Sequence, residues 1–269
     1  MRIRSPIAAL VALALSPVGV PPPASARNLV DVSQTKHRTK VVNIALSPGT
    51  RQLTTAAHAF GWGKPVARDE FDYTGAPKPR KWSVYDSVGH GGNGIRSPAA
   101  WYVNGAVARV TGDSSGTTGG MAALFGHRKY GGWETKMRTN ARDSEYHPVA
   151  LLWPDSGDWP CGGEIDYAEG TTDVTEIHFY LHYSCSNLQT STTKGIDTTR
   201  WHAYAVQWTP NRIVGYIDGV RWFRDSKPSH LPPGRMHQTL QLDWFPDATA
   251  TTTSWMEIAW VRVYDAQTA

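Results

Sequence analysis

The stretch Gly162-Gly163-Glu164-Ile165-Asp166-Tyr167-Ala168-Glu169 places three carboxylates in a segment whose other residues are typical of a buried β-strand. Charge is costly to bury without partners, so packing alone gives no reason for these acids. Neighbouring carboxylates raise one another's pKa, which suits chemistry that needs one protonated and one ionised acid. The alternative is an acidic edge strand facing water, but the apolar residues between the acids argue against it.

Strand geometry predicts which of these acids lie together. Side chains alternate between the two faces of a strand, so Glu164 and Asp166 share one face and Ile165 lies on the other. A one-residue bulge after Asp166 would return Glu169 to the acidic face. Glu164 and Glu169 could then approach to about 5–6 Å, as the nucleophile and the acid/base of retaining glycosidases do. We therefore predict Glu164, Asp166 and Glu169 as catalytic residues, with Asp166 tuning the other two.

A turn and a second strand follow the acidic stretch and predict a hairpin centred near Asp173. Cys161 and Cys185 are equally far from this turn and would face each other, as a cross-strand disulfide requires. Paired cysteines in an exported chain favour a disulfide. The same register places His182 opposite Glu164, where it could contact substrate or tune the acids; a purely structural histidine is the alternative.

Short alternating runs separated by turn residues continue along the chain and predict many strands. We predict hairpin turns at 209–211 and 218–219. No long helical pattern is present, which favours an all-β sandwich over a doubly wound α/β sheet. The clearest strand patterns are at 107–110, 133–137, 177–181, 203–208, 213–217 and 256–264.

Residues 1–26 have the pattern of a secretory signal peptide, which predicts an exported mature chain starting at Arg27. A positive start precedes a mostly apolar run over 7–18, and Ala24-Ser25-Ala26 forms a small-x-small cleavage site. An uncleaved anchor is the alternative, but the run is shorter than the roughly 20 residues of a membrane helix. No other run is long enough to span a bilayer, so no membrane partner is predicted.

The basic residues are concentrated near the N-terminus. Residues 27–66 have six basic residues and one acid, whereas the chain from Ala67 onward has 19 basic and 22 acidic residues. We therefore predict a partly ordered basic arm over 27–66, with one strand over 40–46, ahead of a folded domain over 67–269. The arm is either a solvated linker or a segment drawn to an anionic surface. The domain lacks the basic excess that a nucleic-acid partner would require.

The acidic stretch with Trp159 ahead of it resembles the active-site signature of glycoside hydrolase family 16, in the bulged-strand branch that includes laminarinases, agarases and carrageenases. The resemblance extends in order from about Ala67 to Asp265. The other segments similar to the family are Asp69-Glu70-Phe71 with Lys81-Trp82, residues 201–219 and residues 255–264.

This resemblance implies a jelly-roll β-sandwich of the concanavalin A-like type with a sugar-binding cleft on its concave face. It implies that Glu164 is the nucleophile, that Glu169 is the general acid/base and that Asp166 assists the nucleophile. Trp159 would line the site near the cleaved bond, and His182 matches a histidine of the following strand.

The chain departs from the family at several positions. A cleft tryptophan of the family is replaced by Leu151, and Trp153 lies two residues on, hence on the same face. Asp243 and Trp244 stand in a segment that is commonly Asn-rich. We predict Trp153, Trp159, His182 and Trp244 as substrate-binding residues, although tryptophans in a sandwich also serve as core. Ala259 replaces an Asp that often binds calcium, so no cofactor or metal is predicted.

The expected function is that of a secreted retaining endo-glycosidase acting on β-linked polysaccharide, with β-1,3-glucan favoured or a mixed β-1,3/1,4-glucan. One alternative is a non-catalytic carbohydrate-binding protein on the same fold, which loss of either glutamate would have favoured. A sibling enzyme acting on a galactan is the other. We expect a monomer.

Overall fold

The computed structural model describes residues 54–266, so the predicted leader and the strand expected over 40–46 lie outside the described residues. Within this range no helix is long and apolar enough to cross a membrane. Helical structure is confined to α1 (Ala56–Ala59) and the 3-10 turns η1 (His90–Gly92), η2 (Pro98–Ala100) and η3 (Pro228–His230). The strands are β1 (Ala67–Asp69), β2 (Thr74–Gly75), β3 (Trp82–Val84), β4 (Ser87–Val88), β5 (Ile95–Arg96), β6 (Trp101–Asn104), β7 (Ala108–Gly112), β8 (Thr117–Ala123), β9 (Gly131–Thr139), β10 (Tyr146–Pro154), β11 (Glu164–Glu169), β12 (Glu176–Tyr183), β13 (Leu188–Gly195), β14 (His202–Thr209), β15 (Arg212–Ile217), β16 (Val220–Asp225), β17 (Met236–Trp244) and β18 (Ser254–Tyr264).

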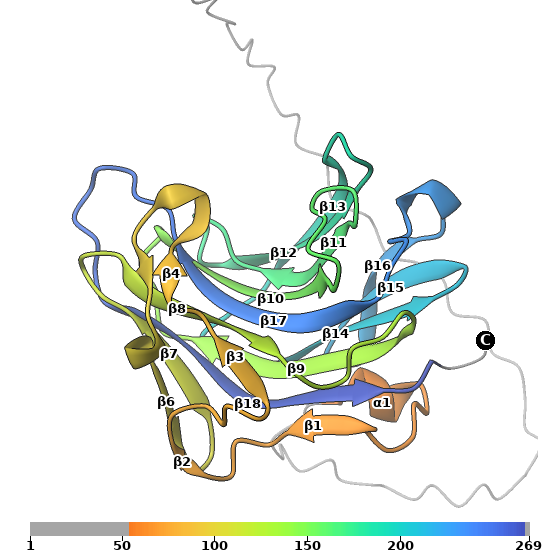
Figure 1. Ribbon diagram of the computed structural model, residues 1–269, viewed down its shortest axis with the longest axis horizontal. Helices are drawn as coiled ribbons and strands as arrows, with labels where there is room; N and C mark the ends of the chain where they lie inside the picture. The colour runs from red at the N-terminus through yellow and green to blue at the C-terminus, as the bar shows by residue number, and fades with distance from the viewer. Residues whose placement is uncertain (1–53, 267–269) are drawn as a thin grey trace, which may run out of the picture. The chain divides into compact units, whose positions relative to one another are not determined.

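The strands form two nine-stranded sheets stacked as a sandwich (Figure 1), which confirms the predicted all-β fold. One sheet has the order β16-β15-β14-β9-β18-β7-β6-β2, with β1 added beside β18. The other has the order β13-β12-β11-β10-β17-β8-β5-β4, with β3 added beside β8. The predicted acidic strand, β11, therefore lies inside the second sheet, between β10 and β12, and is not an edge strand.

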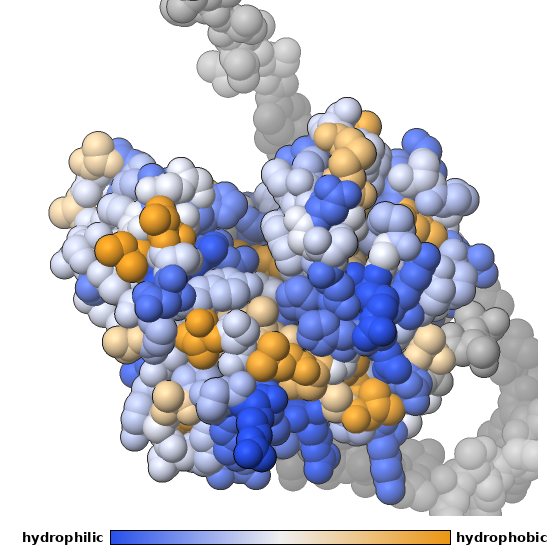
Figure 2. Space-filling model, viewed as in Figure 1, coloured by the Kyte–Doolittle hydropathy of each residue, from blue (hydrophilic) through white to orange (hydrophobic). Residues whose placement is uncertain are grey.

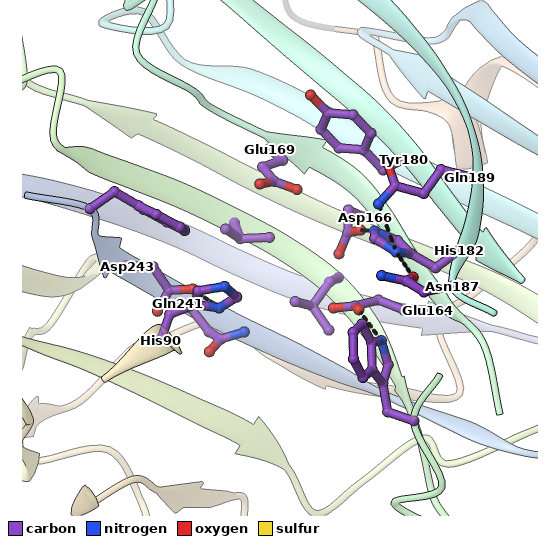
Figure 3. Close-up of a pocket in the computed structure, with 14 residues that line it drawn as sticks. His90, Glu164, Asp166, Glu169, Tyr180, His182, Asn187, Gln189, Gln241 and Asp243 are labelled. Carbon is purple, nitrogen blue, oxygen red and sulfur yellow. Dashed lines mark hydrogen bonds and ion pairs between the residues drawn. The ribbon is translucent and has the colours of Figure 1, made fainter. Parts of the chain in front are cut away.

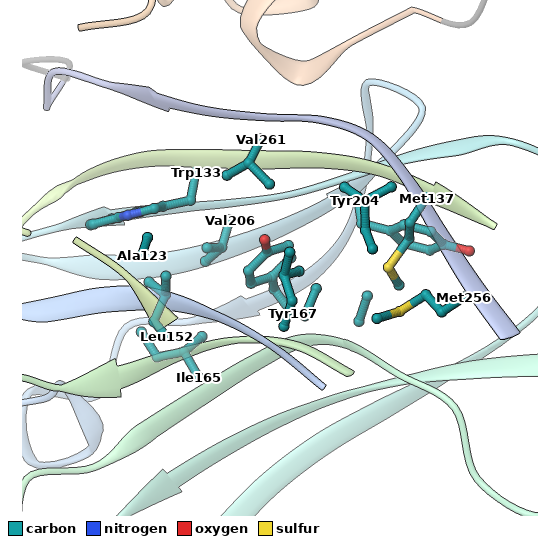
Figure 4. Close-up of a cluster of buried hydrophobic side chains, with 14 of the residues drawn as sticks. Ala123, Trp133, Met137, Leu152, Ile165, Tyr167, Tyr204, Val206, Met256 and Val261 are labelled. Atoms are coloured by element: carbon teal, nitrogen blue, oxygen red, sulfur yellow. The ribbon is translucent and has the colours of Figure 1, made fainter. Parts of the chain in front are cut away.

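The hydrophobic core lies between the two sheets. Trp133 of β9 and Val206 of β14 face Leu152 of β10 and Ile165 of β11 across this layer (Figure 4), and all four are fully buried. Strand β12 shows how alternation builds both surfaces of its sheet. Its residues alternate between buried apolar side chains in the core and polar or aromatic side chains on the opposite face.

A bulge in β11 places two consecutive residues, Tyr167 and Ala168, in the core. The pairing with β12 shifts by one residue between Asp166 and Glu169, as predicted. The Tyr167 hydroxyl donates to Gln238 Oε1 at 2.5 Å and lies 2.7 Å from the Thr135 hydroxyl. Because burial raises the cost of an unpaired hydroxyl, these two partners hold Tyr167 inward. Alternation alone would already place Tyr167 inward and would turn Ala168 to the acidic face, so the bulge is what keeps Ala168 in the core and returns Glu169 to the acidic face.

Residues 56–62, which lie within the predicted partly ordered arm, pack on the folded body. Helix α1 packs on the outer face of the first sheet, where Ala56 and Trp62 are buried against Tyr216 and Tyr264. The Ala56 N–H donates to the buried carboxylate of Glu134 at 2.6 Å. Burial raises the pKa of Glu134 to about 7, although hydrogen bonds from the helix oppose this shift. The distribution of charged residues along the sequence does not predict this contact, because the partner of the Ala56 N–H is a single carboxylate on the distant strand β9.

Candidate active site

A cleft of about 400 Å³ lies on the face of the second sheet that points away from the core. Figure 2 shows the surface hollowed between the part that carries β4 and the part that carries β11, β12 and β13. A second hollow of about 380 Å³ adjoins the first, and the two share Trp159, Glu164, His90 and Gln241 in their linings. Because the hollows meet at Glu164, space is available on both sides of this carboxylate.

The three predicted acids all line this cleft, on the same face of β11 (Figure 3). Glu164 and Asp166 share the face by alternation, and the bulge returns Glu169 to it. The register between β11 and β12 also agrees with the prediction. Glu164 pairs with His182, and a disulfide joins Cys161 to Cys185.

Trp159 lies beside the first acid. Its indole Nε1 donates to Glu164 Oε2 at 2.8 Å, and 41% of the residue is exposed. Its ring stacks on Trp153, with centroids 6.3 Å apart and planes 10° from parallel. The exposed Trp159 and the partly exposed Trp153 offer flat surfaces of the kind that stack on sugar rings. The structure therefore places Trp153 and Trp159 together at one end of the acid row.

The environments of the two glutamates differ. Burial and the charge of Asp166 raise the pKa of Glu164, whereas the charge of His182 and the Trp159 hydrogen bond lower it. Burial, followed by the charges of Glu164 and Asp243, raises the pKa of Glu169 to about 8. Within residues 54–266 no hydrogen-bond donor to the Glu169 carboxylate is present to oppose this shift. The two carboxylates therefore differ in their partners: the Trp159 N–H and the charge of His182 stabilise the ionised form of Glu164, and Glu169 has neither among its described contacts.

His182 contacts the middle acid. Its Nε2 lies 3.2 Å from Asp166 Oδ2, and its Nδ1 lies 2.7 Å from the side-chain oxygen of Asn187. Burial would lower the pKa of His182, but the hydrogen bond and charge of Asp166 outweigh burial and raise it. Burial also raises the pKa of Asp166. The raised pKa of His182 therefore favours a cationic imidazole beside the central carboxylate of the row.

The wall opposite β11 is made of residues that sequence reasoning did not assign to the site. Gln241 and Asp243 of β17 line the cleft together with His90 of η1. Arg96 donates to Asp243 at 2.6 Å, which holds that carboxylate in place. In β17, Gln241 and Asp243 alternate with the buried residues Leu240 and Leu242. This alternation places Gln241 and Asp243 on the cleft face of the strand, so the sequence could have indicated both. His90 lies in a turn, where no periodic pattern exists.

The departures noted in the sequence have structural consequences. Leu151 forms part of the cleft floor, and Trp153 lines the adjoining hollow, so both lie on the predicted face. Trp244 was predicted to bind substrate, but its ring packs on the hydrophobic core and its Nε1 donates to Glu145 at 3.1 Å. Trp244 shares strand parity with Leu242, a core residue, whereas Asp243 faces the cleft, and substrate binding by Trp244 stays a prediction.

Removing the Cys161–Cys185 disulfide is expected to destabilise the fold and loosen the acid row. The bond closes a loop that contains all of β11 and β12, so it restricts the unfolded chain. We expect Cys161→Ser/Cys185→Ser to lose about 3 kcal/mol of unfolding free energy. Urea unfolding with and without dithiothreitol measures this, since reductant should destabilise the parent and leave the double variant unchanged. Equal midpoints for both proteins without reductant would contradict the expectation.

The sequence model described as glycosyl hydrolases family 16 matches residues 100–262, more than half of the chain. The chain belongs to family 16. All three acids, together with Trp159 and His182, lie within the matched residues. The family resemblance of the acidic stretch is therefore confirmed over a region that spans both sheets.

Individual relatives agree with family 16 membership. A beta-glucanase from Rhodothermus marinus is 32% identical over 190 residues, which cover 59% of this chain and 64% of that protein, less than two thirds of its length. The laminarinase structure from Rhodothermus marinus has 24% identity and a TM-score of 0.66, with 76% of this chain and 98% of that chain covered. The catalytic domain of an endo-1,3-beta-glucanase (laminarinase) from Thermotoga petrophila has 20% identity, a TM-score of 0.66 and the same coverage. These likenesses confirm the predicted jelly-roll sandwich.

Proposed function

We propose that this family 16 chain is a retaining endo-glycosidase that hydrolyses β-1,3-glucan or mixed β-1,3/1,4-glucan. The observation that carries the proposal is the placement of Glu164 and Glu169 on one face of β11, around Asp166, in an open cleft. Two carboxylates in different electrostatic environments are what double displacement at a sugar carbon requires. An open cleft with space on both sides of Glu164 suits a long chain cut at internal bonds.

In the first step Glu164 attacks the anomeric carbon as the carboxylate. The bond from that carbon to the glycosidic oxygen breaks, and Glu169 gives its proton to the departing oxygen. A covalent ester between the sugar and Glu164 results. The Trp159 N–H keeps the attacking carboxylate oriented, and the cationic His182 beside Asp166 limits repulsion along the acid row.

In the second step the ionised Glu169 takes a proton from water, and the water oxygen attacks the same carbon. The ester bond breaks and returns Glu164 as a carboxylate, while Glu169 is again protonated. Two inversions give net retention of configuration. The proton on Glu169 thus leaves with one product and is replaced from water.

The printed names of the relatives, a beta-glucanase and two laminarinases, favour β-glucan as the substrate. Leu151 gives the cleft floor an aliphatic surface, and the aromatic surface is shifted to Trp153 and Trp159. This arrangement supports sugar stacking mainly at the Trp153 end of the cleft.

A polysaccharide panel with product stereochemistry tests this function. Release of reducing ends from laminarin, mixed-link glucan, agarose and carrageenan would be measured, with early anomer ratios followed by NMR. We expect cleavage of laminarin or mixed-link glucan with the β-anomer formed first. Cleavage of a galactan alone would reassign the substrate, an inverted first product would exclude the nucleophile role, and binding without cleavage would indicate a carbohydrate-binding protein.

We expect kcat/KM to fall above a pH of about 8. The pKa of Glu169 is raised to about 8 by burial and by Glu164, so this carboxyl keeps its proton at neutral pH and loses it as the pH rises. A general acid must be protonated, so the lost activity lies on the alkaline side. A pH profile of kcat/KM on laminarin measures this, and a rate at pH 10 equal to that at pH 7 would contradict it.

We also infer that the enzyme acts as an exported monomer. The Cys161–Cys185 bond supports export, since disulfides persist in oxidising compartments. Size-exclusion chromatography with light scattering, and activity in the culture supernatant against the cell lysate, test the two statements separately.

A further inference from the structure

A second cluster of ionisable side chains lies away from the acid row. It consists of His127, after β8, Asp155, after β10, and His237, in β17. One ligand atom from each residue lies within 4.8 Å of the other two. The three residues come from distant parts of the sequence, so no spacing motif marked them.

The two imidazole rings converge on one carboxylate oxygen. Nδ1 of His127 lies 2.9 Å from Asp155 Oδ1, and Nδ1 of His237 lies 2.8 Å from the same oxygen. The rings stack with centroids 4.8 Å apart. Arg235 approaches the other carboxylate oxygen, with Nε 3.5 Å from Oδ2, which leaves Oδ1 to the histidines.

Hydrogen bonding decides which nitrogen of His127 has the lone pair. Its Nε2 lies 2.8 Å from the carbonyl oxygen of Ala123, which can only accept, so Nε2 holds the hydrogen. In the neutral ring Nδ1 is then an acceptor, and it faces Asp155 Oδ1, which is also an acceptor. Two acceptors at 2.9 Å repel each other unless a proton on Nδ1 or a metal ion joins them, and the zinc titration below distinguishes these two cases.

We propose that His127, Asp155 and His237 form a binding site for a divalent transition-metal ion, with Zn²⁺ as the best-matched ion. Two imidazoles and one carboxylate are an N/O ligand set typical of zinc, with remaining positions open to water. Zinc at about 2.0–2.1 Å from its ligands spaces them about 3.3 Å apart in a tetrahedron. The observed contacts of 2.8 and 2.9 Å need only a small opening to admit the ion.

The hydrogen bonds that surround the three ligand residues support this assignment. The Nε2 hydrogen bond of His127 to a backbone carbonyl is the outer-shell arrangement that orients a metal-bound histidine. Arg235 also donates to the backbone carbonyl of His127 at 2.7 Å and so joins two of the three ligand segments. The ligand side chains are partly exposed, at 31% for His127, 24% for Asp155 and 14% for His237, so an ion has a path of entry.

The metal would tie together three segments at one end of the cleft. His237 pairs with Trp153 across β10 and β17, so both side chains lie on the same face of the sheet. Trp153 lines the hollow that adjoins the acid row, whereas the three ligands lie beyond it. The ion would therefore stabilise the support of Trp153 without contacting Glu164 or Glu169.

Calorimetric titration of the full chain with ZnCl₂, after treatment with EDTA and dialysis, tests the site. We expect one zinc per chain, and binding at least about 100-fold weaker in His237→Gln and in His127→Gln, since even outer-shell changes cost 10–100-fold. Thermal unfolding should shift upward by about 5–10 °C at free zinc 100-fold above Kd, in the parent only. Circular dichroism in EDTA checks that the variants fold.

Two control variants make the test specific. His202→Gln removes a histidine from a His–Asp pair, with Nδ1 2.7 Å from Asp218, that has no third ligand among residues 54–266, and this variant should bind zinc as the parent does. His182→Gln removes the histidine of the catalytic cluster and should also leave the affinity unchanged. Absence of binding at 1 mM zinc, equal affinity in His237→Gln and the parent, or loss of binding in His182→Gln would each overturn the proposal.

Discussion

Glu164→Gln is expected to lower kcat on laminarin by about 10⁴-fold or more, because the amide cannot form the covalent sugar ester. The change keeps the size of the side chain and removes its charge from beside Asp166. Substrate affinity should stay within a few fold, since Trp159, His182 and the opposite wall remain. Reducing-end assays give the rate, and calorimetry with a laminarin oligosaccharide gives the affinity.

A matched variant separates loss of the nucleophile from loss of any carboxylate. Glu70 forms an ion pair with Arg262 at 2.9 Å, away from the cleft, so Glu70→Gln should retain the parent kcat.

Azide provides a direct test of the nucleophile role of Glu164. With Glu164→Ala it should attack the anomeric carbon itself and yield the inverted glycosyl azide, because the covalent step is bypassed. A near-parent rate in Glu164→Gln would refute the assignment.

Glu169→Gln is expected to lower kcat on polysaccharide by about 10²–10⁴-fold, the range that general acid–base catalysis supplies. The loss should depend on the leaving group. A dinitrophenyl glycoside departs without protonation, so its first step should proceed at nearly the parent rate and the glycosyl ester on Glu164 should accumulate. Rapid-quench kinetics with mass spectrometry of the denatured protein would detect this ester.

The same variant also tests the pH assignment. If Glu169 is the group with the pKa raised to about 8, the alkaline limb of the kcat/KM profile should disappear in Glu169→Gln. Azide should restore its turnover with retention, since it replaces water in the second step. A variant that keeps both the alkaline limb and the parent rate would require another acid, and Asp166 is the nearest candidate by position on β11.

Much of the catalytic strand could be predicted because the controlling rules are local. Alternation placed Glu164 and Asp166 on one face, and hairpin symmetry about Asp173 paired Cys161 with Cys185. These relations depend on neighbouring residues and on one turn. The bulge was predicted from the need to bring Glu169 onto the acidic face, and in the structure it also keeps Ala168 in the core beside Tyr167.

The parity of Trp244 with Leu242 is a local feature of β17, whereas two other departures from the predictions originate in long-range contacts. Helix α1 belongs to the body because of the buried Glu134, a residue from the middle of β9. His90 lines the cleft from a turn far from β11 in the sequence.

The sequence by itself determined the all-β class, the order of the acids on their strand and the disulfide, since each follows from a period of two or from a single turn. Only the tertiary structure decided which residues face the acids across the cleft and which histidines meet at Asp155. These groupings arise when β17 packs beside β10 and β8, strands separated by long stretches of chain. Side chains brought together in this way share no sequence spacing, because sheet pairing rather than chain connectivity places them.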